Sequence, residues 1–125
     1  MPIVEPELIP DGSHDINTCE VVSKKIFKQV FNALEDYQVL LKGCLFKPHM
    51  IKEGAECKEK LGPLKVAEKT VSVFRETLPA NLGGVFFLSG GQSELQATNN
   101  LHCINKRSNE EGKIWHLSFS FGRAL

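Results

Sequence analysis

Short apolar segments, each ending next to a polar or charged residue and a proline or glycine, recur four times along this chain. The residues that close these segments are Glu5, Lys47, Ser89 and Arg123. They are 42, 42 and 34 residues apart. An interval of about 40 residues accommodates one strand, one helix and their connections. The chain is therefore predicted to repeat a strand–helix unit four times.

The segments between the predicted strands have helical patterns. The first has an apolar stripe between a turn at residues 10–13 and Tyr37, formed by Val21, Val22, Ile26, Val30, Phe31 and Leu34. The second begins near Pro63, which suits a first helical turn, and ends before Pro79. Its stripe consists of Val66, Ala67, Val71, Phe74 and Leu78.

The third segment between strands opens with a capping box. Ser93 is followed three residues later by Gln96, which predicts a helix that begins there and runs to about Ile104. Residues 107–112 are polar and end in glycine. They are predicted to form a surface loop before the last strand.

Alternating strands and helices indicate an α/β fold with a parallel sheet and right-handed crossovers. Four units in 125 residues correspond to half of a (β/α)8 TIM barrel, which typically needs about 250 residues. A doubly wound sheet is the alternative, but it favours continuous Val, Ile and Leu strands and a glycine-rich turn near its start. Reactive residue types at each strand end favour the barrel. We therefore expect a half barrel that forms one domain over residues 1–125.

Composition excludes several classes of partner. Fifteen basic and fifteen acidic residues cancel, which gives no electrostatic reason to expect nucleic acid or an anionic membrane. No stretch approaches the roughly 20 apolar residues of a membrane span. The four cysteines form no CxxC pair or zinc-type cluster, so reduced thiols and no zinc site are expected. No cofactor is expected. The first residues resemble neither a signal nor a transit peptide, and a cytoplasmic protein is expected.

Lys47 and Glu5 are the candidate catalytic residues. A lone lysine at a strand end is most simply a side chain that reaches into solvent. Glu5, however, lies at the equivalent position one unit earlier, so both side chains would reach the same mouth of a barrel. An amine beside a carboxylate can attack a carbonyl and exchange the protons of imine formation. Glu7 could orient Glu5 or share its proton, whereas the simpler interpretation of this segment is a solvated turn.

The two remaining strand ends suggest an anion site. Ser89, Gly90 and Gly91 precede a helix N-terminus, where backbone amides can surround a phosphate. A plain turn between strand and helix is the alternative. Gly122 and Arg123 follow the last strand, and an arginine there can bind the same phosphate through two hydrogen bonds.

Four motifs resemble those of class I fructose-bisphosphate aldolase, in the family's order. They are PIVEPE at residues 2–7, LFKP at 45–48, FLSGGQS at 87–93 and FGRAL at 121–125. The resemblance implies strands five to eight of a (β/α)8 barrel and reversible cleavage of fructose 1,6-bisphosphate to dihydroxyacetone phosphate and glyceraldehyde 3-phosphate in glycolysis. It further implies that Lys47 forms the imine, that Glu5 transfers protons, and that the Ser89 and Arg123 turns bind phosphate without a metal.

The chain also departs from that family pattern. His49 stands where the family usually has asparagine, Phe121 where it has tyrosine, and Lys42 where it has glutamate. The first four strands, which would carry an aspartate and two further lysines, are not in the sequence. A fragment or truncated product is therefore expected. Its partners would be a sugar phosphate and either a second copy or another aldolase chain. The alternative function is a non-catalytic remnant that binds phosphate or joins a full-length aldolase subunit.

Overall fold

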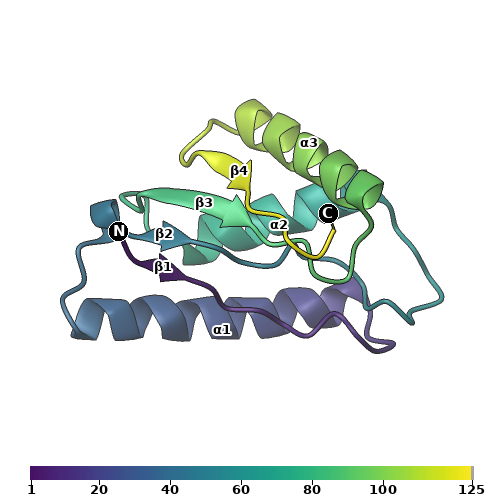
Figure 1. The fold of residues 1–125 in the computed structure, drawn as a ribbon, viewed down its shortest axis with the longest axis horizontal. Coiled ribbons are helices and arrows are strands. Elements are labelled where there is room, and N and C mark those ends of the chain that lie inside the picture. Colours follow the sequence, from purple (N-terminus) through teal and green to yellow (C-terminus); the bar gives the residue numbers. More distant parts are fainter. Residues whose placement is uncertain (125) are drawn as a thin grey trace.

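Strands and helices alternate through the chain, as predicted (Figure 1). The structure is a computed structural model that describes residues 1–124, and Leu125, the end of the FGRAL motif, lies outside the described residues. The strands are β1 (Ile3–Val4), β2 (Leu45–Phe46), β3 (Gly84–Phe87) and β4 (Leu117–Phe119). The helices are α1 (Ile16–Asp36), α2 (Pro63–Thr77) and α3 (Glu94–Glu110), with a 3-10 turn at Leu41–Gly43 before β2.

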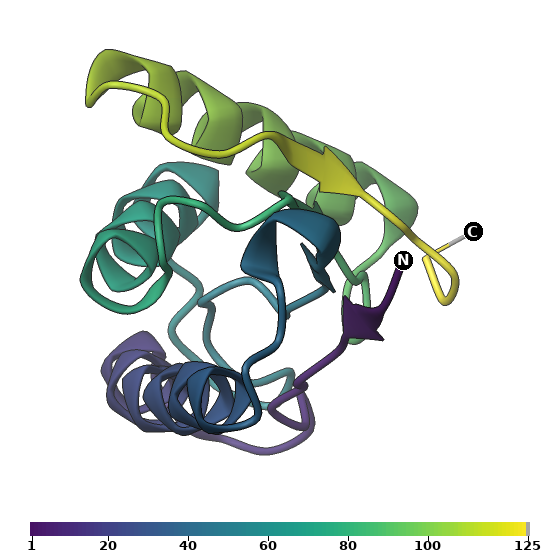
Figure 2. The same ribbon diagram turned by 90° about the vertical axis from the view of Figure 1, so that its left-hand side faces the viewer.

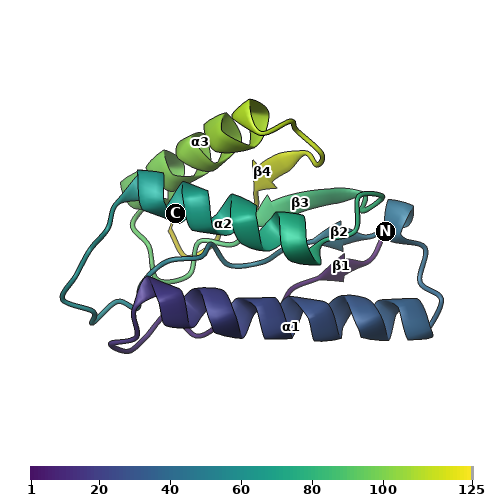
Figure 3. The same ribbon diagram turned by 180° about the vertical axis from the view of Figure 1, so that it is seen from behind.

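The four strands form one parallel sheet in sequence order, β1-β2-β3-β4. Ile3 is opposite Leu45, Phe46 is opposite Val85, and Phe87 is opposite Phe119. The three helices cover one face of this sheet, as the views from the side and from behind show (Figures 2 and 3). Sequential parallel strands with all helices outside are the arrangement of a (β/α)8 barrel. The chain thus forms the predicted half barrel.

Helix α2 follows its sequence pattern closely. Pro63 occupies the first turn, and the five residues of the predicted stripe are all buried. The stripe faces the sheet because apolar side chains at 3.6-residue spacing share one side of a helix. Leu78 ends the helix ahead of Pro79, as expected.

The predicted buried face of α1 is partly wrong. Asp15 caps the helix by accepting a hydrogen bond of 2.8 Å from the Thr18 amide. The buried side chains are Ile16, Cys19, Ser23, Phe27 and Phe31, whereas Val21 is 53% exposed. The face is rotated relative to the prediction because a polar residue, Ser23, lies at its centre, and a hydrophobic pattern cannot reveal a buried serine.

Helix α3 is longer than predicted, and the expected loop at residues 107–112 is wrong in its first part. Ser93 accepts a hydrogen bond of 3.1 Å from the Gln96 amide, which confirms the predicted start. The helix then continues to Glu110. Ser108 is buried, and Arg107 pairs with Glu111 at 2.6 Å. This pair at i and i+4 supports a helix in a polar segment.

Aromatic side chains form the centre of the core between helices and sheet. Phe27 of α1 meets Phe46 of β2 edge to face, with ring centroids 5.2 Å apart. Phe74 of α2 stacks on Phe87 of β3 at 5.5 Å. Each of these four side chains is at most 1% exposed. Burying such rings supplies much of the hydrophobic stabilisation of a domain this small.

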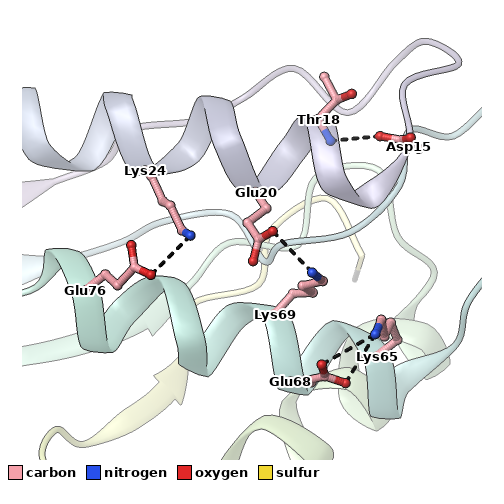
Figure 4. A network of polar contacts seen from close by, with 8 residues as sticks. All are labelled: Asp15, Thr18, Glu20, Lys24, Lys65, Glu68, Lys69 and Glu76. Atoms are coloured by element: carbon pink, nitrogen blue, oxygen red, sulfur yellow. Dashed lines mark hydrogen bonds and ion pairs between the residues drawn. The ribbon is translucent and has the colours of Figure 1, made fainter.

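Ion pairs also connect neighbouring helices at the surface. Lys69 of α2 lies 3.2 Å from Glu20 of α1, and Lys24 of α1 lies 3.2 Å from Glu76 of α2 (Figure 4). Partly exposed pairs of this kind contribute at most about 1 kcal/mol each. Among residues 1–124, no helix has the length and apolar composition needed to cross a membrane.

Residues 54–56 donate three backbone hydrogen bonds to carbonyls of residues 10–14 and so join two loops beside the strand ends. A Cβ on Gly54 would collide with the Gly12 carbonyl oxygen and lie 2.9 Å from the His14 ring. We expect Gly54→Ala to lower the free energy of unfolding by about 2 to 3 kcal/mol. Gly43→Ala is the control, because its Cβ would meet only an ordinary contact at 3.8 Å. Equal urea midpoints for the two variants would contradict this prediction.

Candidate functional site

The C-terminal ends of β1 and β2 bring the predicted amine and carboxylate together. Lys47 Nζ lies 3.2 Å from Glu5 Oε1. The side chain of Lys47 is 22% exposed and that of Glu5 is 50% exposed, so solvent reaches both. The strand register causes this proximity, because the Lys47 amide donates to the Val4 carbonyl at 2.8 Å. The expectation that Glu5 and Lys47 share one mouth agrees with this geometry.

Glu7 has a different partner from the one expected. Its Oε1 lies 2.6 Å from Arg123 Nη2, so the ion pair joins the segment after β1 to the segment after β4. The sequence suggested that Glu7 could orient Glu5 or share its proton, with a solvated turn as the simpler interpretation, whereas the structure pairs it with the candidate phosphate-binding arginine. The Arg123 side chain is 65% exposed, so solvent screens this pair, which positions the guanidinium group more than it stabilises the fold.

The Ser89-Gly90-Gly91 turn packs against that ion pair. A Cβ on Gly90 would lie 2.6 Å from Glu7 Oε1 and 3.0 Å from Arg123 Nη2, so glycine permits the close approach. Gly91 has a φ of +80°, and a Cβ there would collide with the Pro10 side chain. The two glycines therefore allow the turns after β1, β3 and β4 to converge.

Ser89 and Gly122 differ in their surroundings. Ser89 is 2% exposed, and its Oγ accepts a hydrogen bond of 3.1 Å from the Ala124 amide. This bond holds the segment after β4 against the end of β3. A Cβ on Gly122 would meet nothing within 4 Å, so no close contact in residues 1–124 requires glycine at that position.

His49, two residues after Lys47, is buried and bonded on both ring nitrogens. Its Nδ1 accepts a hydrogen bond of 3.1 Å from the Leu8 amide, and its Nε2 lies 2.7 Å from Ser23 Oγ. The backbone donor at Nδ1 requires a lone pair there, so the neutral ring carries its proton on Nε2 and donates to Ser23. Burial lowers the pKa of His49 to about 4, and the nearby Pro6 carbonyl offsets part of this effect.

Known proteins resemble this chain in sequence and in fold. The family model described as fructose-bisphosphate aldolase class-I matches residues 1–125. The chain belongs to this aldolase family. It is 47% identical over 125 residues to the chloroplastic fructose-bisphosphate aldolase 1 of Chlamydomonas reinhardtii, covering 100% of this chain and 32% of that protein. It is 50% identical over the same length to fructose-bisphosphate aldolase B of Ovis aries, covering 34% of it.

A solved aldolase structure shares the fold. The fructose-bisphosphate aldolase from Plasmodium falciparum, in complex with TRAP and a small-molecule inhibitor, superimposes with a TM-score of 0.93 at 48% identity. The match covers 100% of this chain and 35% of that one. The chain spans about a third of the length of the curated relatives that it matches.

A buried lysine, Lys52, lies near the candidate site of this aldolase-family chain, and sequence reasoning missed it. Lys52 is 7% exposed, and its Nζ donates to the Glu53 carbonyl at 2.9 Å. Burial lowers the pKa of Lys52. The cavity that it lines is about 20 Å³, enough for roughly one water molecule. Lys52 is therefore enclosed, and Lys47 is the better placed of the two to meet a sugar.

The lowered pKa of His49 predicts a pH dependence of stability. The unfolded chain binds a proton at His49 below pH 6.5, whereas the folded chain does so only below about pH 4. The neutral His49 ring therefore imposes no loss of folding stability above pH 6.5, and stability is lost as the pH falls from 6.5 to about 4. The loss is about 1.4 kcal/mol per pH unit, or roughly 3 kcal/mol in total.

Urea unfolding between pH 4 and pH 7 measures this effect. The variant His49→Asn has no titrating group at this position, so its stability should fall less steeply with pH than that of the wild type. Parallel curves for the two proteins would contradict the assignment of the effect to His49.

Proposed function

We propose that this chain provides the imine-forming half of a class I fructose-bisphosphate aldolase. The reaction is the reversible cleavage of fructose 1,6-bisphosphate to dihydroxyacetone phosphate and glyceraldehyde 3-phosphate. The 3.2 Å contact between Lys47 Nζ and Glu5 Oε1 carries the proposal, in a chain whose whole length matches this family. The substrate class is a sugar phosphate, and the proposed chemistry needs no metal.

Lys47 is the proposed nucleophile and Glu5 the proposed proton carrier. Glu5 accepts a proton from the Lys47 ammonium, and the free amine attacks the ketose carbonyl carbon. The alkoxide formed by this attack takes a proton from the attacking nitrogen and becomes a hydroxyl group. Glu5 then returns its proton to this hydroxyl, which leaves as water and yields the iminium ion. This cation withdraws the electron pair of the neighbouring carbon–carbon bond, which breaks and leaves an enamine on Lys47. The hydroxyl group on the departing carbon loses its proton to Glu5, now a carboxylate again, and becomes the aldehyde carbonyl.

Ser89, Gly90, Gly91, Gly122 and Arg123 form the proposed phosphate site. The Ser93 end of α3 lies directly behind the two glycines, and a helix N-terminus attracts anions. Glu7 is proposed to hold Arg123 in place while no phosphate is bound, because it contacts the same guanidinium group. An incoming phosphate must then share or displace this contact.

Removal of the Glu7 charge tests this arrangement. Glu7→Gln is expected to tighten the binding of inorganic phosphate by about fivefold, since a competing carboxylate beside Arg123 is neutralised. Isothermal titration at low salt measures the change. Glu56→Gln, an exposed position, is the control for net charge. Weaker phosphate binding in Glu7→Gln would show instead that Glu7 is needed to orient Arg123.

Borohydride reduction tests the imine chemistry directly. The 125-residue chain is incubated with dihydroxyacetone phosphate, reduced, and weighed intact by mass spectrometry before peptide mapping. One adduct per chain, at Lys47, is the expected result. A folded chain that forms no adduct, or forms it at a different lysine, contradicts the proposal.

A second candidate function is phosphate binding or chain association without turnover. Two observations favour it. The relatives are about three times as long as this chain, and β1 and β4 form the two edges of the sheet, which are suited to pairing with further strands. A second copy or another aldolase chain is the proposed partner. An aldol cleavage rate above that of a Lys47→Ala control would exclude a purely non-catalytic role.

We also propose a cytoplasmic location. All four cysteines are free in the structure, which suits a reducing compartment. One relative is named as chloroplastic, so the family is not confined to a single compartment. Fractionation of cells with an antibody to the chain tests this assignment.

A further inference from the structure

The side chain of His49 joins the segment after β1 to the segment after β2, beyond the last backbone hydrogen bond between these strands. The last backbone hydrogen bond between β1 and β2 runs from the Lys47 amide to the Val4 carbonyl, over 2.8 Å. A further link is the hydrogen bond of 3.1 Å from the Leu8 amide to His49 Nδ1. Residues 5–7 therefore lie between two fixed points, one at Lys47 and one at His49.

Residues 5–7 are too few, and too restricted by Pro6, to adopt many backbone conformations between these two fixed points. Three residues bridge them, and Pro6 in the middle has a restricted φ angle. Glu5 and Glu7 flank this proline and supply the contacts to Lys47 and Arg123. With both ends attached, few backbone conformations remain, and the two carboxylates are held toward the mouth of the half barrel.

The ring of His49 is itself oriented by α1. Its Nε2 donates to Ser23 Oγ at 2.7 Å, and Ser23 is 0% exposed. The Phe27 ring lies beside the imidazole, with centroids 5.4 Å apart. The side chain is thus fixed by packing and by a buried hydrogen bond, which is what a group that positions another segment requires.

We propose that His49 is a positioning residue, which sets the distance between Glu5 and Lys47 by holding the Leu8 amide. This inference rests on the proposed function, because the positioned pair is the proposed imine site. His49 makes its contacts with Leu8 and Ser23 and acts on the reaction through Glu5.

Two substitutions separate positioning from simple filling of space. In His49→Asn, the amide oxygen occupies nearly the place of Nδ1 and can accept from the Leu8 amide, but the side chain is too short to reach Ser23. In His49→Leu, a similar volume is retained without an acceptor. If His49 only filled space, leucine would be the better replacement. If it positions Glu5, asparagine should be.

The rate of borohydride-trapped adduct formation at Lys47 with dihydroxyacetone phosphate is the first readout. We expect His49→Leu to be at least about tenfold slower than the wild type and His49→Asn to be within about threefold of it. Ile104→Ala, at a buried position of α3, controls for lost stability alone and should trap at the wild-type rate in its folded fraction. Trapping by His49→Leu at the rate of this control would overturn the inference.

Amide hydrogen exchange at Leu8 is the second readout, and it does not depend on activity. Protection of this amide should be kept in His49→Asn and lost in His49→Leu. If the wild type itself forms no adduct, the proposed function fails while this measurement still decides the role of His49. Unchanged Leu8 protection in His49→Leu contradicts that role. If His49→Leu does not fold, His49→Ala replaces it, since alanine also offers no acceptor to the Leu8 amide and adds no bulk.

Discussion

Replacing Lys47 with methionine is expected to abolish the borohydride-trapped adduct with dihydroxyacetone phosphate. Methionine keeps the unbranched apolar stem, so the packing beside Phe46 should survive. It has no amine, and the carbonyl carbon then has no nucleophile at the mouth of the half barrel. Adduct formation should fall by at least about 1000-fold, to the background of surface lysines. Intact mass after reduction, with peptide mapping, measures the loss.

A matched control exists elsewhere in the chain. Lys69 is paired with Glu20 at the same 3.2 Å separation, and its side chain is 19% exposed, close to the value for Lys47. It lies on α2 and points toward Glu20 of α1 (Figure 4). Lys69→Met should therefore leave the adduct at Lys47 intact. Retention of the adduct in Lys47→Met, or its disappearance in Lys69→Met, would contradict the assignment of the nucleophile to Lys47.

Phe74→Ala is expected to have the largest effect on stability, a loss of about 3 to 5 kcal/mol. Phe74 is 1% exposed. Its ring lies 6.2 Å from Phe27, 5.5 Å from Phe87 and 6.3 Å from Trp115. One side chain thus connects α1, β3 and the segment that leads into β4. Its removal leaves a cavity that three separate elements would have to fill, and backbone hydrogen bonds limit how far they can move.

Leu64→Ala on the same helix is the control for this prediction. Leu64 is 76% exposed, so its truncation should change stability by no more than about 0.5 kcal/mol. Urea unfolding of both variants, followed by circular dichroism, gives the difference directly. A loss below about 1 kcal/mol in Phe74→Ala would mean that the helical layer collapses onto the sheet without cost, which the close packing of the four rings argues against.

The strand ends and α2 were predictable from the sequence because each has a local signal. A lysine followed by proline or a serine followed by two glycines marks where a strand stops, and parallel pairing then brings such ends to one edge. The placement of Glu5 and Lys47 at one mouth follows from this rule. The stripe of α2 was also complete, since no polar side chain interrupts it.

Other features depend on partners far apart in the sequence, and these escaped prediction. Ser23 reaches His49 across 26 residues, so neither position looks unusual by itself. Glu7 and Arg123 are 116 residues apart, and charge alone does not tell whether Glu7 prefers Arg123 or the neighbourhood of Glu5. The end of α3 was missed because its last turn is polar, and a single ion pair at helical spacing is a weak signal.

The sequential order of the strands has a consequence for how the site fluctuates. β2 and β3 each have a neighbour on both sides, whereas β1 and β4 are bonded along one edge only. Local opening should therefore begin at the outer strands, which Glu5 and Arg123 follow in the chain, and reach Lys47, which directly follows β2, last. The proposed amine of Lys47 is thus attached to the part of the sheet that opens last. Glu5 and the proposed phosphate-binding Arg123 are attached to the parts that open first. Any further strand that pairs with β1 or β4 would steady those two groups without touching either of them.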